Sequence, residues 1–310
     1  MKQLEEILGK DRLITNKDLF PNLTLRTKTK AQYYFEAKSR ADLVNAYRAA
    51  LKLKLPFLLL GGGSNLAVIS KTIKGLVIRN LYQHKEVVKG DEKNVEISIS
   101  SGYPVTFLIN ELTLLGYAGL EYHLGLPGTV GGALYMNSKW TRPPNYFGDH
   151  LLYAFLLDKN GNVKKVDRDY FQFGYDSSVL QKTKEILLEA VFRLKKEKPE
   201  VLKERALAAL NYRKDTQPFG VASSGCFFRN ISEGEKKRLN LSTSSAGYLI
   251  DRAGLKGYTV GSFFISPKHA NFILNKGQGN QRDLKKILAD VKAKVRKKFG
   301  VELEEEVLVI

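Results

Sequence analysis

Glycine and proline make up five of the nine residues from Gly125 to Ala133, and this density limits what the chain can fold into. An ordinary helix or hairpin presents side chains along its length, whereas this stretch is mostly bare backbone, which can approach a neighbouring surface closely. We therefore expect the segment, which ends at Asn137, to lie against a flat or charged group.

A second glycine cluster, Gly61–Asn65, directly follows the apolar run Phe57–Leu60, which predicts a short buried strand. Backbone N–H groups at such a position can converge on an anion. The cluster lacks the Gly-Lys-Ser/Thr of a Walker loop and the G-x-G-x-x-G of a dinucleotide-binding turn. By itself it predicts either an anion-binding loop or a plain turn.

A third cluster, Ser223–Asn230, contains Cys226, which is the only cysteine in the chain. A single cysteine excludes an internal disulfide and fits a reducing cytosol. Since Phe227 and Phe228 follow it, the residues alone favour a small buried apolar side chain over a reactive thiol.

Hydrophobic periodicity, capping residues and turn signals predict mixed α and β structure. Helices are expected from the Ser39 cap through Ala50, from Pro104 to Leu115, over 244–254 and over 281–299. Strands are expected at 57–60, 75–79, 94–99, 151–157, 186–194, 258–265 and 271–274, with a tight turn at Asn160-Gly161. The charged, proline-containing segment 195–204 predicts a domain boundary.

Charge is the one unusual bulk property, because 50 Lys and Arg against 32 Asp and Glu give a net charge of +18. This surplus favours an anionic partner such as nucleic acid, a phosphorylated cofactor or an acidic membrane surface, but a lysine-rich proteome explains it equally well. The chain has no RNP-like aromatic motif, so we expect no nucleic-acid partner. The basic amphipathic helix at 281–299 is expected to pack on its own domain.

Apolar runs are as short as Pro56–Leu60, and the first twenty residues contain no apolar core. We therefore expect neither a membrane span nor a secretory signal, and the chain is expected to be soluble and cytoplasmic. The four histidines and the cysteine show no metal-ligand spacing, so we expect no metal.

Taken in order, these clusters and further motifs resemble the UDP-N-acetylenolpyruvoylglucosamine reductase (MurB) family in its shorter form. The segments that carry the resemblance are Gly61–Asn65, Leu126–Ala133 with Met136-Asn137, Ser224–Asn230, Ala246–Gly257, Ile265–Asn275 and Leu303–Val307. One such motif would be weak evidence, whereas the ordered set is specific.

The resemblance implies an α+β chain with a two-subdomain FAD-binding fold of the vanillyl-alcohol-oxidase (PCMH) type, followed by a C-terminal α+β substrate domain. The expected FAD-binding region is 1–198, with subdomains at about 20–82 and 83–198, and the expected substrate domain is 199–310.

It also implies the activity of a flavoprotein oxidoreductase with FAD and NADPH as cofactors. The implied reaction reduces UDP-N-acetylglucosamine enolpyruvate to UDP-N-acetylmuramate for peptidoglycan synthesis, and thereby serves cell wall biogenesis, cell shape and cell division. The sugar nucleotide and NADPH are the implied partners, and a monomer is expected.

The family motifs imply roles at matching positions. Cys226 is the implied proton donor, because a thiol with a pKa of about 8.5 stays mostly protonated at neutral pH yet gives up its proton more easily than a hydroxyl. Glu306, among the glutamates at 302 and 304–306, is the implied catalytic carboxyl group. The implied substrate residues are Arg213, Arg229, Asn230 and His269, and the implied cofactor residues are Gly61, Gly62, Gly63, Ser64, Asn65, Leu126, Pro127, Gly128, Thr129, Gly131, Gly132 and Asn137.

One position departs from the family pattern. The resemblance implies an arginine that helps to hold the developing enolate, but Asp176 stands at that place. We hypothesise that Lys139 or Arg142, in the unusual stretch 138–149, supplies the missing charge and that Asp176 orients it. The alternative is that 138–149 forms only a surface loop.

Smaller departures fall at Arg26–Ala31 and at Thr216. Two alternatives therefore stay open. A flavin oxidoreductase of the same superfamily with another substrate would share the N-terminal pattern but not the motifs from Cys226 to Glu306. A homologue that binds flavin without catalysis is consistent with Asp176.

Overall fold

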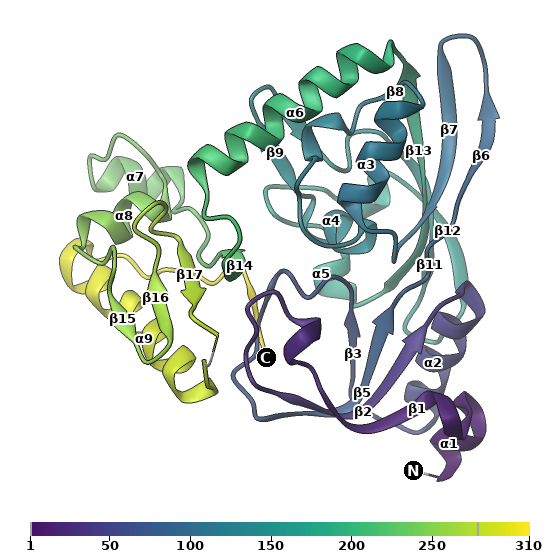
Figure 1. Cartoon of the computed structure of the whole chain (residues 1–310), viewed down its shortest axis with the longest axis horizontal. Coiled ribbons are helices and arrows are strands. Elements are labelled where there is room, and N and C mark those ends of the chain that lie inside the picture. Colours follow the sequence, from purple (N-terminus) through teal and green to yellow (C-terminus); the bar gives the residue numbers. More distant parts are fainter. Residues whose placement is uncertain (1, 278) are drawn as a thin grey trace. The chain divides into compact units, whose positions relative to one another are not determined.

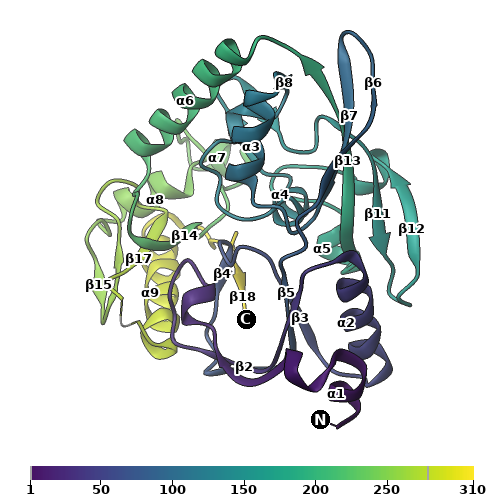
Figure 2. The ribbon, with the colours of Figure 1, turned by 45° about the vertical axis from the view of Figure 1, so that its right-hand side comes forward.

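A computed structural model describes residues 2–277 and 279–310 (Figures 1 and 2). The chain divides into two compact units, each with a hydrophobic core. The first unit comprises Met1–Asn16, Gln32–Gly62 and Lys74–Arg213, and the second comprises Lys17–Ala31, Gly63–Ile73 and Lys214–Ile310.

One sheet of the first unit packs with helices near the N-terminus. Its elements are α1 (Lys2–Leu8), β1 (Leu13–Asp18), β2 (Lys30–Ala37), α2 (Arg40–Lys52), β3 (Phe57–Leu60) and β5 (Thr72–Asn80). The strand order is β1-β2-β5-β3, with β3 and β5 parallel. Helix α2 begins as predicted, because the Ser39 hydroxyl accepts a hydrogen bond from the Asp42 N–H at 3.1 Å.

A larger antiparallel sheet forms the rest of this unit. Its strands are β6 (Lys85–Gly90), β7 (Asn94–Ser100), β11 (Leu151–Leu157), β12 (Val163–Asp167) and β13 (Ile186–Lys196), in the order β12-β11-β13-β7-β6. The helices are α3 (Val105–Leu114), α4 (Val130–Met136), α5 (Leu180–Thr183) and α6 (Pro199–Thr216). Helices α3, α4 and α6 lie on the same side of this sheet (Figures 1 and 2). They cover a core that includes Ile97, Ile99 and Leu108.

The second unit contains a sheet with the order β14-β17-β16-β15. Its elements are β14 (Ala222–Cys226), α7 (Glu233–Arg238), α8 (Ala246–Arg252), β15 (Thr259–Val260), β16 (Phe263–Ile265), β17 (Phe272–Asn275) and α9 (Gln281–Phe299). Helix α9 has the predicted bounds and buries the predicted apolar face, including Leu284, Ile287 and Val291. Strand β4 (Leu66–Ala67) pairs in parallel with β18 (Leu308–Val309).

Short elements complete the chain. Strand β8 (Tyr117–Ala118) joins β13, and β9 (Lys139–Thr141) pairs with β10 (Pro144–Tyr146). The 3-10 helices are η1 (Lys10–Arg12), η2 (Phe20–Asn22), η3 (Glu121–His123) and η4 (Asp169–Phe171). Among the described residues, no helix is both long and apolar enough to cross a membrane.

Helix α6 was not predicted, because its charged residues conceal the helical period. Its buried positions are Leu202, Ala206, Ala209 and Arg213, which recur at the spacing of one helix face. Pro199 occupies its first position, where the missing N–H costs nothing. The domain boundary predicted near residue 198 stays a prediction.

Asn275 ties the N-terminal part of the second unit to its sheet. Its side chain is 2% exposed, and its Nδ2 donates hydrogen bonds to the carbonyl oxygens of Leu25 (2.9 Å) and Arg26 (3.0 Å). Its Oδ1 accepts from the N–H groups of Gly277 and Gly279. One carboxamide therefore satisfies four backbone groups.

We expect Asn275→Ala to lower the free energy of unfolding by about 3 kcal/mol or more, because buried backbone groups lose their partners. Asn280 is a matched control, since its exposed side chain only caps α9 and its replacement by alanine should cost about 1 kcal/mol. Urea unfolding of both variants measures the difference. Equal losses of unfolding free energy in the two variants would contradict the stabilising role assigned to the Asn275 carboxamide.

Candidate active site

The predicted site residues fall in both units. In the first unit lie Gly61, Gly62, Leu126, Pro127, Gly128, Thr129, Gly131, Gly132, Asn137 and Arg213. In the second lie Gly63, Ser64, Asn65, Cys226, Arg229, Asn230, His269 and Glu306. Within each unit, residues that are distant in sequence come together.

The first two glycine clusters meet in the first unit. A Cβ atom built on Gly62 would lie 2.5 Å from the Cα of Gly128, and one on Gly61 would lie 2.7 Å from the Thr129 Oγ1. Only glycine permits so close an approach of two backbones. The two clusters therefore form one backbone surface with few side chains.

The cluster Gly125–Ala133 is also bonded to the loop between β7 and α3. The Gly128 carbonyl accepts from the Val105 N–H at 3.0 Å, and the Gly131 N–H donates to the Ser101 carbonyl at 2.8 Å. Thr129 caps α4 by accepting from the Gly132 N–H. Part of the glycine pattern is thus required by the fold itself.

Arg79, in β5, holds the cluster Gly61–Asn65, because its guanidinium donates a hydrogen bond to the Gly61 carbonyl. The pKa of Arg79 is lowered by burial, which outweighs the opposing effects of Tyr34 and Glu36. No motif in the sequence singled out Arg79. The signal that could have found it is a lone cation directly after the apolar run Leu76–Ile78.

The side chain of Asn137 joins two loops at the end of α4. Its Nδ2 donates to the Gly174 carbonyl at 3.0 Å, and its Oδ1 accepts from the Gly148 N–H at 3.2 Å. Asn137 itself adopts the left-handed conformation that ends the helix. This predicted cofactor residue therefore has a structural task in the described residues.

Lys139 and Asp176 form the pair that the sequence analysis hypothesised. The Lys139 Nζ lies 3.3 Å from the Asp176 Oδ2, with side-chain exposures of 22% and 9%. It also lies 3.3 Å from the centre of the Tyr175 ring, which is a cation–π contact. Asp176 has a φ of 46°, which is uncommon outside glycine. The stretch 138–149 is accordingly more than a surface loop.

Arg213, on α6, is a buried cation with unused donors. It is 7% exposed, and neither its Nε nor its Nη2 has a hydrogen-bond partner among the described residues. Burial lowers the pKa of Arg213 to about 10. Its guanidinium carbon lies 4.8 Å from the centre of the Trp140 ring, and its Cδ lies 3.6 Å from the place of a Cβ on Gly125. An anionic or carbonyl-bearing group within reach of the guanidinium would satisfy these donors.

His123 is a second buried titratable group in this unit, and sequence analysis did not select it. Its Nε2 lies 2.9 Å from the Asn145 Oδ1, while its Nδ1 has no partner among the described residues. Burial, with a smaller contribution from the charge of Arg213, lowers the pKa of His123 to about 3. The ring is therefore neutral at ordinary pH.

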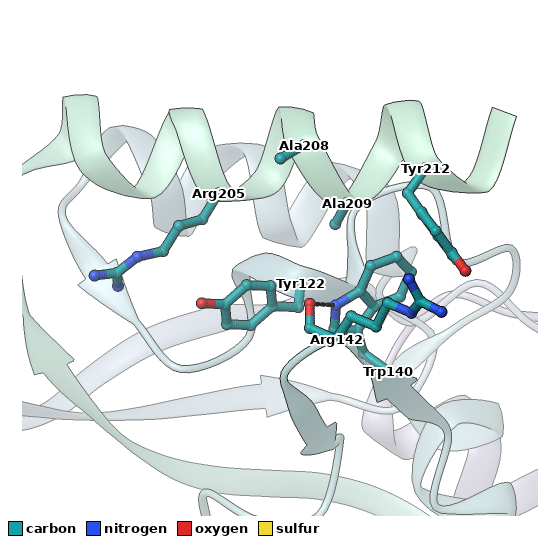
Figure 3. A pocket seen from close by; sticks show the side chains of 7 residues that line it. All are labelled: Tyr122, Trp140, Arg142, Arg205, Ala208, Ala209 and Tyr212. Atoms are coloured by element: carbon teal, nitrogen blue, oxygen red, sulfur yellow. Dashed lines mark hydrogen bonds between the residues drawn. The ribbon is translucent and has the colours of Figure 1, made fainter. Parts of the chain in front are cut away.

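A pocket of about 260 Å³ lies beside α6 (Figure 3). Its aromatic walls are Tyr122, Trp140 and Tyr212, and its cations are Arg142 and Arg205. Ala208 and Ala209 of α6 complete the lining. Arg142 thus lies at this pocket and not beside Asp176.

In the second unit, Cys226 ends a strand that pairs with distant segments. Asn271 holds the residues that follow it: the Asn271 Oδ1 accepts from the Phe228 N–H at 3.0 Å, and its Nδ2 donates to the Phe228 carbonyl at 2.8 Å. On the other side, the Ser224 hydroxyl donates to the Leu66 carbonyl at 2.7 Å. The position of half-buried Cys226 is therefore fixed from both sides.

Glu306 lies next to this strand. Its N–H donates to the Phe227 carbonyl at 2.8 Å, and the neighbouring Glu305 is bridged to Phe228. Two other glutamates of this segment form ion pairs, Glu305 with Lys292 at 3.0 Å and Glu302 with Arg296 at 2.9 Å. The fold thus brings the backbones beside Cys226 and Glu306 together.

The remaining predicted substrate residues have distinct surroundings. The Asn230 Oδ1 accepts from the Ala246 N–H at 3.1 Å and so helps to start α8. The Arg229 N–H donates to the Glu304 carbonyl at 2.9 Å. The His269 Nδ1 accepts from the Asn271 N–H at 3.3 Å, and burial lowers the pKa of His269. Within residues 2–277 and 279–310, no group of three or more acidic, histidine or cysteine side chains is placed to hold a metal ion.

Comparisons with known proteins agree with this arrangement. Residues 31–167 match the model of an FAD binding domain. Residues 217–310 match the model of the C-terminal domain of UDP-N-acetylenolpyruvoylglucosamine reductase. The second match includes Cys226, His269 and Glu306.

Similar proteins cover the whole chain. UDP-N-acetylenolpyruvoylglucosamine reductase from Chlamydia trachomatis is 34% identical over 287 residues, which is 93% of this chain and 92% of that protein. The reductase from Bacillus pumilus is 31% identical over 99% of this chain and 96% of that protein.

Solved structures give the same result. The crystal structure of the reductase from Thermus caldophilus has a TM-score of 0.76 and 29% identity, covering 96% of this chain and 97% of that one. The structure of p-cresol methylhydroxylase matches with a TM-score of 0.54 and 11% identity over 96% of this chain and 87% of that one, which shows a shared fold alone. The predicted α+β fold, with an FAD-binding domain of the vanillyl-alcohol-oxidase (PCMH) type, is confirmed.

We expect His123 to make the stability of the protein fall as the pH falls below about 6.5. The folded pKa is depressed, so below that pH the unfolded chain binds a proton that the folded chain does not. The stabilisation is fully present above about pH 6.5 and is lost as the pH approaches about 3, by at most about 1.4 kcal/mol per pH unit.

Urea unfolding of the natural chain and of His123→Gln between about pH 7 and about pH 5 measures this effect. The substituted chain should show the smaller loss of unfolding free energy on acidification. His150 and His269, whose pKa values are also lowered, contribute equally to both proteins. Identical pH slopes would show that His123 is not held neutral.

Proposed function

Because the chain belongs to the UDP-N-acetylenolpyruvoylglucosamine reductase family, we propose that it reduces UDP-N-acetylglucosamine enolpyruvate to UDP-N-acetylmuramate with FAD and NADPH. The product would serve peptidoglycan synthesis in the cytoplasm, with the protein acting as a monomer. The observation that carries this proposal is the similarity over 93% of the chain, which extends through the C-terminal motifs from Cys226 to Glu306.

The first unit fits FAD on its own geometry. Gly61, Gly62 and Gly128 form a backbone surface that carries few side chains, which suits close contact with a cofactor. The unpaired donors of Arg213 suit the carbonyl-bearing edge of a flavin ring. We therefore assign Arg213 to the cofactor in this proposal, and not to the substrate as the sequence motif implied. Residues 1–198 together with Arg213 would hold FAD, and the remainder of residues 199–310 would bind the sugar nucleotide.

When bound and reduced by NADPH, FAD supplies a hydride to the terminal carbon of the enolpyruvyl group. Negative charge then develops beside the substrate carboxylate, and a proton must reach the adjacent carbon. The Cys226 thiol would give this proton, after which the former double bond is single and the thiolate regains a proton from water. The contacts of Asn271 and Ser224 on either side of Cys226 support a fixed donor.

Glu306 and Lys139 would handle the negative charge. A carboxyl group beside the substrate carboxylate helps only if it carries or shares a proton, so Glu306 would act as a hydrogen-bond donor. The ammonium of Lys139, oriented by Asp176, would attract the developing enolate in place of the family arginine. Arg229, Asn230 and His269 would contact the UDP-sugar.

An anaerobic experiment in two steps tests the proposed function. NADPH should first bleach the flavin absorbance of the protein, and the enolpyruvyl sugar should then restore it and yield UDP-N-acetylmuramate. Bleaching without restoration by the sugar would indicate another acceptor or lost catalysis, and would contradict the proposal.

We expect Cys226→Ala to slow reoxidation of the flavin by the sugar at least about 100-fold, because the proton donor is removed. Reduction by NADPH should be unchanged, since it does not use this proton. Stopped-flow absorbance separates the two steps, and Cys226→Ser, which keeps a donor, should retain more activity than Cys226→Ala. Near-normal turnover in Cys226→Ala would refute the role.

The neighbouring glutamates provide a matched pair of variants. Glu306→Gln should lower kcat by about 100-fold if the carboxyl group donates in the reaction. Glu305→Gln should leave kcat nearly unchanged, because Glu305 is part-exposed and pairs with Lys292. Steady-state assays with saturating NADPH compare kcat of the two variants. Equal losses of kcat would contradict the specific role proposed for Glu306.

A further inference from the structure

The pocket beside α6 contains none of the residues that the family motifs assign. Trp140 and Arg142 come from the stretch 138–149, which departs from the family pattern. The other lining residues come from α6 and from η3 (Figure 3). The pocket therefore needs an explanation of its own.

Its aromatic wall is fixed by several contacts. The Trp140 ring is 6% exposed and meets the Tyr212 ring edge-on, with centres 5.6 Å apart. The Trp140 Nε1 donates to the Arg142 carbonyl at 2.6 Å, which fixes the turn between β9 and β10. The Arg142 guanidinium lies 5.2 Å from the centre of the Tyr212 ring. A cation is thus held at the edge of an aromatic wall.

The helix side of the pocket is shallow and apolar. Ala208 and Ala209 present only methyl groups, so a planar ring can approach α6 closely. Tyr122, from η3, adds a further ring to the lining, opposite α6 (Figure 3). Such a surface accepts an aromatic ring more readily than a sugar, because it offers stacking faces and few hydrogen-bonding groups.

The charge of the wall is positive. Arg205 is paired with the buried Glu121 at 3.3 Å, so its charge is largely neutralised. In contrast, Arg142 forms no ion pair among the described residues, and its guanidinium lies beside the Tyr212 ring. It therefore gives the pocket a positive potential.

We propose that this pocket binds the nucleoside phosphate end of one of the two nucleotide substrates. The base would lie on Ala208 and Ala209 among the aromatic rings, and the phosphate would face Arg142. A volume of about 260 Å³ suits a nucleoside phosphate better than a whole dinucleotide. The choice of ligand rests on the proposed function, which requires both a UDP-sugar and NADPH.

Trp140 is the only tryptophan of the chain, so its fluorescence reports on this pocket directly. Titration of the flavin-loaded protein with UDP and with 2′,5′-ADP should quench it saturably with at least one of the two. Saturation by UDP alone assigns the pocket to the sugar nucleotide, and saturation by 2′,5′-ADP alone assigns it to NADPH. No quenching by either, or equally tight binding of inorganic pyrophosphate, overturns the proposal.

Substitutions localise the effect. Arg142→Ala should weaken nucleotide binding at least about 10-fold and raise the KM of the same nucleotide, with kcat unchanged. Ala208→Tyr, on the exposed side of α6, should block binding by filling the pocket. Arg252→Ala is the matched control, because Arg252 lies 5.3 Å over Tyr248 in a similar pair outside the pocket. Unchanged affinity in both pocket variants overturns the proposal.

These outcomes are independent of catalysis. If the protein binds the nucleotide at Trp140 but does not transfer hydride to the enolpyruvyl sugar, the proposed pocket ligand stands and the proposed function fails. If turnover is full and the Trp140 fluorescence does not change, the proposed function stands and the proposed pocket ligand fails.

Discussion

The backbone of Gly62 lies against that of Gly128, with no room for a side chain between them. Several features of the first unit depend on this approach. It places Thr129 where it can cap α4, and the hydrogen bond from Val105 to Gly128 places the start of α3. Beyond the same loop, Asn137 joins the segments that contain Gly148 and Gly174. The proposed cofactor surface and a packing surface therefore share one set of glycines, so a substitution at Gly62 is expected to affect both.

In the second unit, two asparagines hold together backbone segments that are distant in sequence. Asn271 holds the strand that carries Cys226, and Asn275 holds the segment containing Leu25. Both carboxamides are buried, and each satisfies donors and acceptors of the backbone together. Some of the polar side chains of this unit thus position the strand that carries Cys226 and the segment that contains Leu25.

Local signals made much of the fold predictable. The cap at Ser39 and the apolar face of α9 depend on residues close in sequence, and both were found where expected. Helix α6 was missed because its few buried residues are separated by charged ones. Among the site residues, Arg79 and His123 were missed because their partners, Gly61 and Asn145, become neighbours only in the folded chain.

The ion pair of Lys139 and Asp176 was predicted only in part. The departure from the family pattern at Asp176 suggested a nearby compensating cation, and Lys139 pairs with Asp176 in the fold. That Lys139 takes the role of the family arginine stays a prediction. Sequence could not decide between Lys139 and Arg142, because the pairing of β9 with β10 directs them to different surroundings. Arg142 instead contributes to a pocket that no motif indicated.

The visible absorption spectrum of the purified protein, taken after incubation with FAD and removal of the excess, shows whether the first unit binds a flavin. We expect the glycine surface and the unpaired donors of Arg213 to retain FAD, with a spectrum shifted from that of the free cofactor. We expect Arg213→Gln to retain less. A folded protein that remains colourless, or one whose flavin is unaffected by Arg213→Gln, would rule out this mode of binding.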